Sequence, residues 1–255
     1  MIKKIMAYTL LILACITIIV LGIRIFQANR VTTPKGSPSA SELSQKLADT
    51  ACPLKVLILG DSIAKGTGDD QGQGFSEYLP DELKKSTSKD IIVKNEGIDG
   101  LTSKGLLEQL QSKRLNPAIT DADIILVSIG GNDLLKSLPS NLLGQNDAFQ
   151  GELAGYTDNL RQTLGLLRNV YPDSTIILLG LYNPYEILTS AENQHLLNEV
   201  NDQSRKIIES DGNAIFIPTY DLMKYNSARY ISKDGLHPSA LGYQAISKRI
   251  SQALK

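Results

Sequence analysis

The run Ile124-Ile125-Leu126-Val127 decides the fold class, because four consecutive apolar residues suit a strand that is buried on both faces. It opens a predicted strand at residues 124–129. Four more short runs of apolar or β-branched residues share this character, and they lie at 55–59, 91–94, 175–181 and 214–218. The segments between them are long enough for the crossover helices that parallel strands require. The sequence therefore predicts an α/β fold, a three-layer α/β/α sandwich around a five-stranded parallel sheet.

The composition is that of a globular protein with a sizeable core. Of the 255 residues, 42% are hydrophobic and 21% are charged, so the chain can bury a core without metal or disulfide staples. The 26 basic and 27 acidic residues give a net charge of -1. A nucleic-acid-binding face needs clustered basic residues, so we expect no nucleic-acid partner.

Cysteine and histidine are too sparse for a disulfide framework or a zinc site. Cys15 lies inside an apolar run and Cys52 lies just before the first predicted strand, while the two histidines, His195 and His237, are far apart. We therefore expect no metal and no organic cofactor.

The N-terminus predicts a membrane anchor. Residues 5–23 form a run of 19 residues without a charge, which as a helix would be roughly 28 Å long, near the thickness of a bilayer core. A cleavable secretory signal would need a shorter apolar core and a small-residue cleavage site. Lipoprotein processing would acylate Cys15, but the apolar run continues beyond that residue. We expect an uncleaved transmembrane signal-anchor after a short basic N-terminus at residues 1–4.

The segment after this span predicts a tether. Basic residues flank the span on both sides, so their count does not orient it, but the very short basic leader favours a catalytic domain outside the cytoplasm. Residues 24–53 include Thr-Thr-Pro-Lys-Gly-Ser-Pro and predict a linker. Residues 54–255 then form one domain. The predicted location is the cell membrane, as a single-pass protein.

Polar residues follow the first three predicted strands. Gly60-Asp61-Ser62 follows the first strand, residues 95–100 (Asn-Glu-Gly-Ile-Asp-Gly) follow the second, and Gly130-Gly131-Asn132-Asp133 follows the third. The carboxyl ends of parallel strands meet at one edge of a sheet, so these groups are expected to share a crevice. Taken singly, a serine after a strand is more often a helix cap, and glycines there are ordinary turn residues.

Near the C-terminus, Asp234 precedes His237 by three residues, ahead of a predicted helix at 239–254. An acid, an imidazole and a hydroxyl are the minimum for an activated serine. The plainer alternative is a turn carboxylate beside a surface histidine. By contrast, His195 lies in a helical stretch at 191–211 without an acid at such spacing, and we assign it to a solvated or partly packed helix face.

Together these four blocks resemble the SGNH or GDSL hydrolase family of serine esterases and lipases, over nearly all of residues 54–255. The resemblance implies the flavodoxin-like SGNH fold. It implies Ser62 as the nucleophile, with Asp234 and His237 completing a catalytic triad. The implied oxyanion donors are the N–H groups of Ser62 and Gly100 and the amide of Asn132. Gly97 competes with Gly100 for the middle role, and the family pattern favours the last glycine of the block.

The resemblance further implies a monomeric, cofactor-free hydrolase that cleaves lipid or cell-envelope esters through an acyl-enzyme. Two alternatives remain, an acyltransferase that moves the acyl group to a glycan hydroxyl and a catalytically silent surface-binding module. The loops at 137–149 and 182–192 are expected to line the substrate pocket. Several leucines suit either an acyl groove or the core: Leu134, Leu135, Leu138, Leu142 and Leu143.

Overall fold

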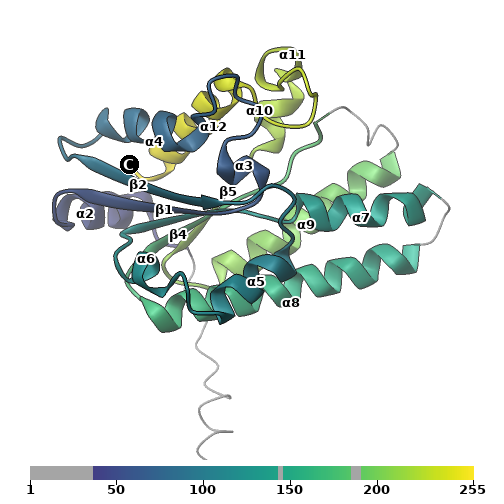
Figure 1. Ribbon diagram of the computed structural model, residues 1–255, viewed down its shortest axis with the longest axis horizontal. Coiled ribbons are helices and arrows are strands. Elements are labelled where there is room, and N and C mark those ends of the chain that lie inside the picture. The colour runs from purple at the N-terminus through teal and green to yellow at the C-terminus, as the bar shows by residue number, and fades with distance from the viewer. Residues whose placement is uncertain (1–36, 143–145, 185–190) are drawn as a thin grey trace, which may run out of the picture. The chain divides into compact units, whose positions relative to one another are not determined.

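A computed structural model of the chain describes residues 37–142, 146–184 and 191–255. Its centre is a parallel sheet of five strands in the order β2-β1-β3-β4-β5 (Figure 1). The strands are β1 (Leu54–Gly60), β2 (Ile91–Gly97), β3 (Ile124–Ser128), β4 (Thr175–Leu179) and β5 (Ala214–Ile217). The predicted α/β fold with five parallel strands is thus confirmed.

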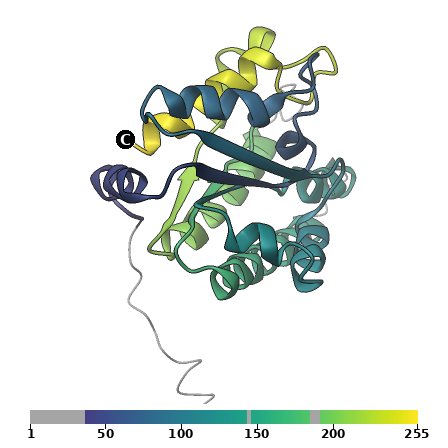
Figure 2. The same ribbon diagram turned by 60° about the vertical axis from the view of Figure 1, so that its left-hand side comes forward.

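Helices cover both faces of the sheet. One face carries α4 (Gly74–Lys84) and α12 (Ala240–Ala253), and the other carries α5 (Ser103–Gln111), α8 (Asn146–Val170) and α9 (Ala191–Glu209), as Figure 2 shows nearly edge-on. The remaining helices are α2 (Ala40–Asp49), α3 (Ser62–Lys65), α6 (Asn116–Thr120), α7 (Gly131–Leu142), α10 (Tyr220–Lys224) and α11 (Ser227–Tyr230).

Alternate residues of each central strand enter two separate cores. In β1, Leu57 and Leu59 pack with α5 and α8, whereas Val56 and Ile58 pack with α4 and α12. Both sets are buried because successive side chains of a strand point to opposite faces. Each such side chain contributes about 1.5 to 3 kcal/mol of transfer free energy. This two-sided burial explains why β1 and β3 read as continuous apolar runs.

Two strand ends differ from the prediction by more than one residue. β2 continues three residues beyond residue 94, because it pairs with β1 as far as Gly60 and Gly97. β4 stops at Leu179, before residue 181. The side chain of Asn201 takes over both backbone groups of Leu181, accepting from its N–H at 2.7 Å and donating to its carbonyl at 2.9 Å.

The described part of the predicted linker packs with the domain. Helix α2 begins at a capping box, in which Ser39 accepts from the Glu42 N–H and the Glu42 side chain accepts from the Ser39 N–H. Leu43 on this helix belongs to the core shared by α4 and α12. Helix α2, which lies within the predicted linker, therefore packs with the domain predicted at residues 54–255.

The predicted membrane span at residues 5–23 lies outside the described residues. Among the residues that the structure does describe, no helix combines the length and the apolar character needed to cross a membrane.

Candidate functional site

Ser62 stands at the sharp turn between β1 and α3. Gly60 adopts φ +129°, and a Cβ there would lie 1.8 Å from the carbonyl oxygen of Ser128, so only glycine fits beside β3. Asp61 caps α3 by accepting from the Ile63 N–H at 3.0 Å. The sequence thereby fixes Ser62 as the first helical residue, just after the carboxyl end of β1.

The structure brings Ser62, His237 and Asp234 together from opposite ends of the domain. His237 Nε2 lies 2.8 Å from Ser62 Oγ, and His237 Nδ1 lies 2.8 Å from Asp234 Oδ2. The other carboxylate oxygen of Asp234 accepts from the N–H groups of Leu236 and His237, at 2.8 Å and 3.0 Å. This arrangement can activate a serine hydroxyl, because the imidazole has one nitrogen on the hydroxyl and the other on a carboxylate.

Hydrogen bonds keep Asp234 ionised. Partial burial alone would raise its pKa, but hydrogen bonds from the Ser232 hydroxyl and from the backbone N–H groups of His237 and Leu236 hold the pKa well below its usual range. A carboxylate that stays charged can stabilise an imidazolium on its neighbour.

Two backbone donors at the site are available to a ligand. The N–H of Ser62 lies at the start of α3, and the N–H of Gly100 lies in the loop after β2. Neither has a hydrogen-bond partner among the residues that the structure describes. Gly100 adopts φ +74°, a conformation that glycine accepts readily.

Hydrogen bonds join the loops that carry these donors to Asn132. The Ile98 N–H donates to the Gly60 carbonyl at 2.9 Å, which ties the loop of Gly100 to the turn of Ser62. Asn132 Nδ2 donates to the Leu101 carbonyl at 2.8 Å, which ties α7 to the same loop. A side-chain amide has two N–H groups, so this bond leaves Asn132 a second donor.

Gly97 has a different role from Gly100. Its N–H donates to Asn95 Oδ1 at 2.9 Å, and a Cβ there would lie 2.3 Å from the backbone nitrogen of Lys65. Gly97 therefore permits close packing of β2 against α3. Of these two glycines, Gly100, which the family pattern favours, is the one whose N–H has no partner among the described residues.

Sequence reasoning assigned no role to Asp133, which joins α7 to the start of α5 by hydrogen bonds. Its carboxylate accepts from the backbone N–H of Ser103 at 2.9 Å and from the Ser103 hydroxyl at 2.6 Å. Asn159 donates to the same hydroxyl at 3.0 Å. Asp133 thus fixes α7 against the start of α5. An acidic residue directly after Asn132 is a signal that could have suggested such a bond.

Asp61 is a second carboxylate that the sequence did not single out. Its side chain is only 2% exposed, and it accepts from the Ser128 hydroxyl at 3.1 Å. Burial raises its pKa to about 6, although hydrogen bonds from the backbone N–H of Ile63 and from Ser128 oppose that rise. A buried acid therefore lies directly before Ser62 in the chain.

An apolar cavity of about 80 Å³ is lined by Ile63 and Leu236, the chain neighbours of Ser62 and His237. Its lining comes from the ends of β3, β4 and β5, from α3, α7 and α12, and from the turn before His237; it includes Ile63, Leu134, Leu135, Leu181, Tyr182 and Leu236. Leu134 also packs against the core beneath α8. The side chains of Leu138 and Leu142, and Leu143 itself, fall outside the described set. The prediction of a loop at 137–149 is wrong for most of its length, because residues 137–142 belong to α7 and residues 146–149 belong to α8. Of the predicted loop at 182–192, residues 185–190 lie outside the described residues, and residues 191 and 192 belong to α9.

The other singled-out residues lie apart from this site. His195 is exposed on α9, and Cys52 is an exposed free thiol. Across the described ranges, no three side chains among histidine, cysteine, aspartate and glutamate come together in a way that could hold a metal ion. Cys15 lies outside the described residues.

Comparisons with known proteins agree on one family. The family model for GDSL-like lipases and acylhydrolases matches residues 58–245. The chain is 31% identical to the uncharacterised protein YpmR of Bacillus subtilis, covering 85% of this chain and 88% of that protein. It is 27% identical to the spore germination lipase LipC of Bacillus licheniformis, covering 78% and 96%. The fold matches that of a lipase from a goat rumen metagenome, with a TM-score of 0.71, 24% identity, and coverage of 79% of this chain and 100% of that one.

Proposed function

The chain belongs to the GDSL-like lipase/acylhydrolase family and is a carboxylic ester hydrolase, and we propose that it cleaves its ester through Ser62, His237 and Asp234. The observation that carries this proposal is the pair of 2.8 Å contacts that His237 makes, one with Ser62 Oγ and one with Asp234. A nucleophile, a base and a group that orients the base are the elements of covalent acyl transfer.

The proposed reaction has two steps. Ser62 Oγ attacks the ester carbonyl carbon while His237 Nε2 accepts the hydroxyl proton. The bond to the alcohol oxygen then breaks, and His237 returns the proton to the leaving alcohol. In the second step His237 takes a proton from water, and the oxygen of that water attacks the acyl carbon. The bond to Ser62 Oγ then breaks, His237 returns the proton to Oγ, and the acid is released. Asp234 holds the imidazole in orientation and stabilises its cationic form in both steps.

The oxyanion of each tetrahedral intermediate is proposed to bind the N–H groups of Ser62 and Gly100 and the amide of Asn132. Support comes from the available N–H groups at the first two positions and from the bonds that join all three loops. Donors that are fixed before the reaction stabilise developing charge without reorganisation, and one such donor contributes about 3 to 4 kcal/mol.

The acyl group is proposed to enter the apolar cavity beside Ser62. Its lining of leucine, isoleucine and tyrosine side chains suits a hydrocarbon chain better than a sugar. We therefore propose a lipid or cell-envelope ester as substrate. The likeness to a spore germination lipase supports this choice.

We also propose that residues 5–23 anchor a monomeric enzyme in the cell membrane, with the domain outside the cytoplasm. The uncharged run of 19 residues supports the anchor. Cell fractionation followed by protease treatment of intact cells tests both points. Recovery in the soluble fraction would refute the anchor, and protection from external protease would refute the orientation.

The reaction is tested with a series of p-nitrophenyl esters from acetyl to palmitoyl, using the full-length chain and its Ser62→Ala variant. We expect Ser62-dependent hydrolysis and labelling of Ser62 by a fluorophosphonate. A preference for chains longer than acetyl supports the role of the apolar cavity, whereas an acetyl-only profile contradicts it. Hydrolysis that survives Ser62→Ala would overturn the proposed mechanism.

A further inference from the structure

Tyr182 connects the end of β4 to the turn that carries His237. It lies three residues beyond Leu179, where β4 ends, and its partly buried side chain lines the apolar cavity. The Tyr182 hydroxyl donates a hydrogen bond to the carbonyl of Leu236 at 2.8 Å. Leu236 directly precedes His237 and lines the same cavity. The hydroxyl therefore holds the backbone next to the imidazole.

Hydrogen bonds within the turn from Ser232 to His237 hold its shape. The Ser232 N–H donates to the His237 carbonyl at 2.8 Å, and the Gly235 N–H donates to the Ser232 carbonyl at 2.8 Å. Asp234 accepts from two N–H groups of the same turn and contacts the imidazole. These bonds fix Asp234 and His237 relative to each other. They do not fix the pair relative to Ser62, which lies on a different element.

We propose that Tyr182 is a positioning residue, which places the rigid Asp234–His237 turn against Ser62 by anchoring the Leu236 carbonyl to the end of β4. The inference rests on the proposed function, because it concerns the distance across which Ser62 gives its proton to His237. In that geometry a displacement of about 1 Å costs on the order of 100-fold in rate.

The hydroxyl provides this anchor over the whole working pH range. Removal from water raises the pKa of Tyr182 well above the ordinary value of a phenol, so the group stays protonated and continues to donate. The Tyr182 hydroxyl donates to a backbone carbonyl and does not contact the reacting atoms. Tyr182 therefore acts through His237 and does not itself transfer a proton.

The test is Tyr182→Phe in the full-length chain, which removes the hydroxyl and keeps the ring. With p-nitrophenyl butyrate we expect kcat to fall roughly 10- to 100-fold while KM changes by less than about twofold. The rate of Ser62 labelling by a fluorophosphonate falls in parallel. In a plot of kcat/KM against pH, the acid limb keeps its apparent pKa, because the Asp234–His237 pair stays intact.

The matched control is Tyr156→Phe. Tyr156 is a buried tyrosine of α8, and its hydroxyl pairs with Ser204 Oγ of α9 at 2.8 Å. Removal of this hydroxyl also loses a buried hydrogen bond, so we expect the thermal midpoint to fall about as much as in Tyr182→Phe. The kcat should stay within about twofold of wild type. This comparison separates a loss of placement from a general loss of stability.

Three results would overturn the inference. If Tyr182→Phe keeps kcat within about twofold while Ser62→Ala is inactive, Tyr182 only fills space and the proposed function stands. If kcat falls and the apparent pKa of the acid limb also shifts, the Asp234–His237 pair itself is disturbed and the positioning role is wrong. If Ser62→Ala keeps its activity, the proposed function fails, and the role of Tyr182 fails with it.

Discussion

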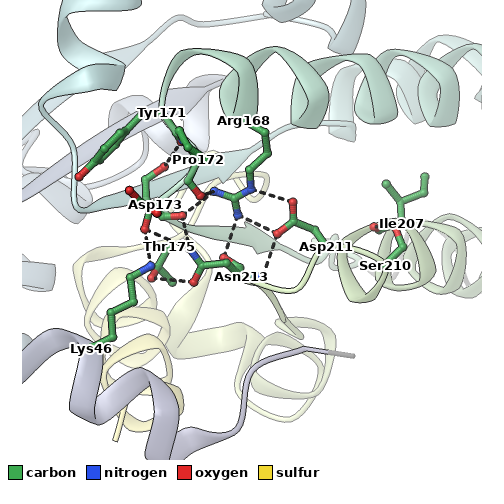
Figure 3. A network of polar contacts seen from close by, with 11 residues as sticks. Lys46, Arg168, Tyr171, Pro172, Asp173, Thr175, Ile207, Ser210, Asp211 and Asn213 are labelled. Atoms are coloured by element: carbon green, nitrogen blue, oxygen red, sulfur yellow. Dashed lines mark hydrogen bonds and ion pairs between the residues drawn. The ribbon is translucent and has the colours of Figure 1, made fainter. Parts of the chain in front are cut away.

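The two ends of the parallel sheet use polar groups in opposite ways. At the amino ends of β4 and β5, Arg168 makes five hydrogen bonds, two with the carboxylate of Asp211 and three with the carbonyls of Pro172, Ser174 and Asn213 (Figure 3). A guanidinium has five N–H donors, so every one is used. At the carboxyl ends, the N–H groups of Ser62 and Gly100 have no partner among the described residues.

This difference separates polar groups that hold the fold from those that can serve a ligand. A donor already paired within the protein stabilises the native state and has nothing left for substrate. A donor that is fixed but unpaired adds little to stability and becomes useful when negative charge develops beside it. Variants at the amino end should therefore lose stability, and variants at the carboxyl end should lose catalytic rate.

The largest effect is expected at the carboxyl end, from His237→Ala. Loss of the base leaves the Ser62 hydroxyl without a proton acceptor, so kcat should fall by about 10,000-fold or more. The thermal midpoint should stay close to that of wild type. Steady-state kinetics and a melting curve on one preparation check both statements. A variant that melts much earlier would show that this end of the sheet also supports the fold.

At the amino end, Arg168→Met should have the reverse outcome. The substitution leaves the largely buried carboxylate of Asp211 without its cation, at a cost of about 3 to 5 kcal/mol in the free energy of unfolding. Urea denaturation measures this loss. The kcat per folded molecule should not change, because the network lies at the opposite end of the strands from Ser62. A large fall in kcat under conditions in which all molecules are folded would contradict this separation of stability from catalysis.

Asn132→Ala tests a single donor of the carboxyl end. We expect kcat to fall roughly 100- to 1,000-fold, the usual effect of removing one oxyanion donor. The matched control is Asn213→Ala at the amino end, where the amide donates to the carbonyls of Asp173 and Ser174. That variant should lose stability and keep kcat. Equal losses of kcat in both variants would remove the distinction between the two ends.

The sequence was most informative where a local pattern decides the structure. Unbroken apolar runs predicted the five strands, and polar blocks after strands predicted that Ser62, Gly100 and Asn132 would gather at one edge. The choice of Gly100 over Gly97 rested on the family pattern, because no local pattern in the sequence tells which N–H already has a partner. The bond from Tyr182 to Leu236 spans 54 residues and has no local signal. The packing of α2 rests on two leucines, Leu43 and Leu47, in an otherwise polar segment, so the composition of the linker did not predict it.

The two carboxylates Asp61 and Asp211 extend the comparison to pH. Burial raises the pKa of Asp61 to about 6, and no ion pair among the described residues includes its carboxylate. Partial burial would also raise the pKa of Asp211, but hydrogen bonds from Arg168 and from the Asn213 N–H lower it below the ordinary value. An acid with a raised pKa lowers stability as pH rises between its unfolded and folded values. An acid with a lowered pKa adds stability as pH rises from its folded value to its unfolded value of 3.8, which is a window below the one for the raised acid.

The Asn variants of these two acids should therefore respond to pH with opposite signs. Between pH 4 and 6, Asp61→Asn should gain stability relative to wild type as pH rises, because the variant carries no buried charge. The gain should be at most about 3 kcal/mol, which corresponds to the rise in pKa. Below about pH 4, Asp211→Asn should lose stability relative to wild type as pH rises, since only the wild type gains a charged carboxylate that pairs with Arg168. Urea denaturation at each pH measures both differences. If the two differences change in the same direction, the assignment of one unpaired and one paired acid to the two ends of the sheet is wrong.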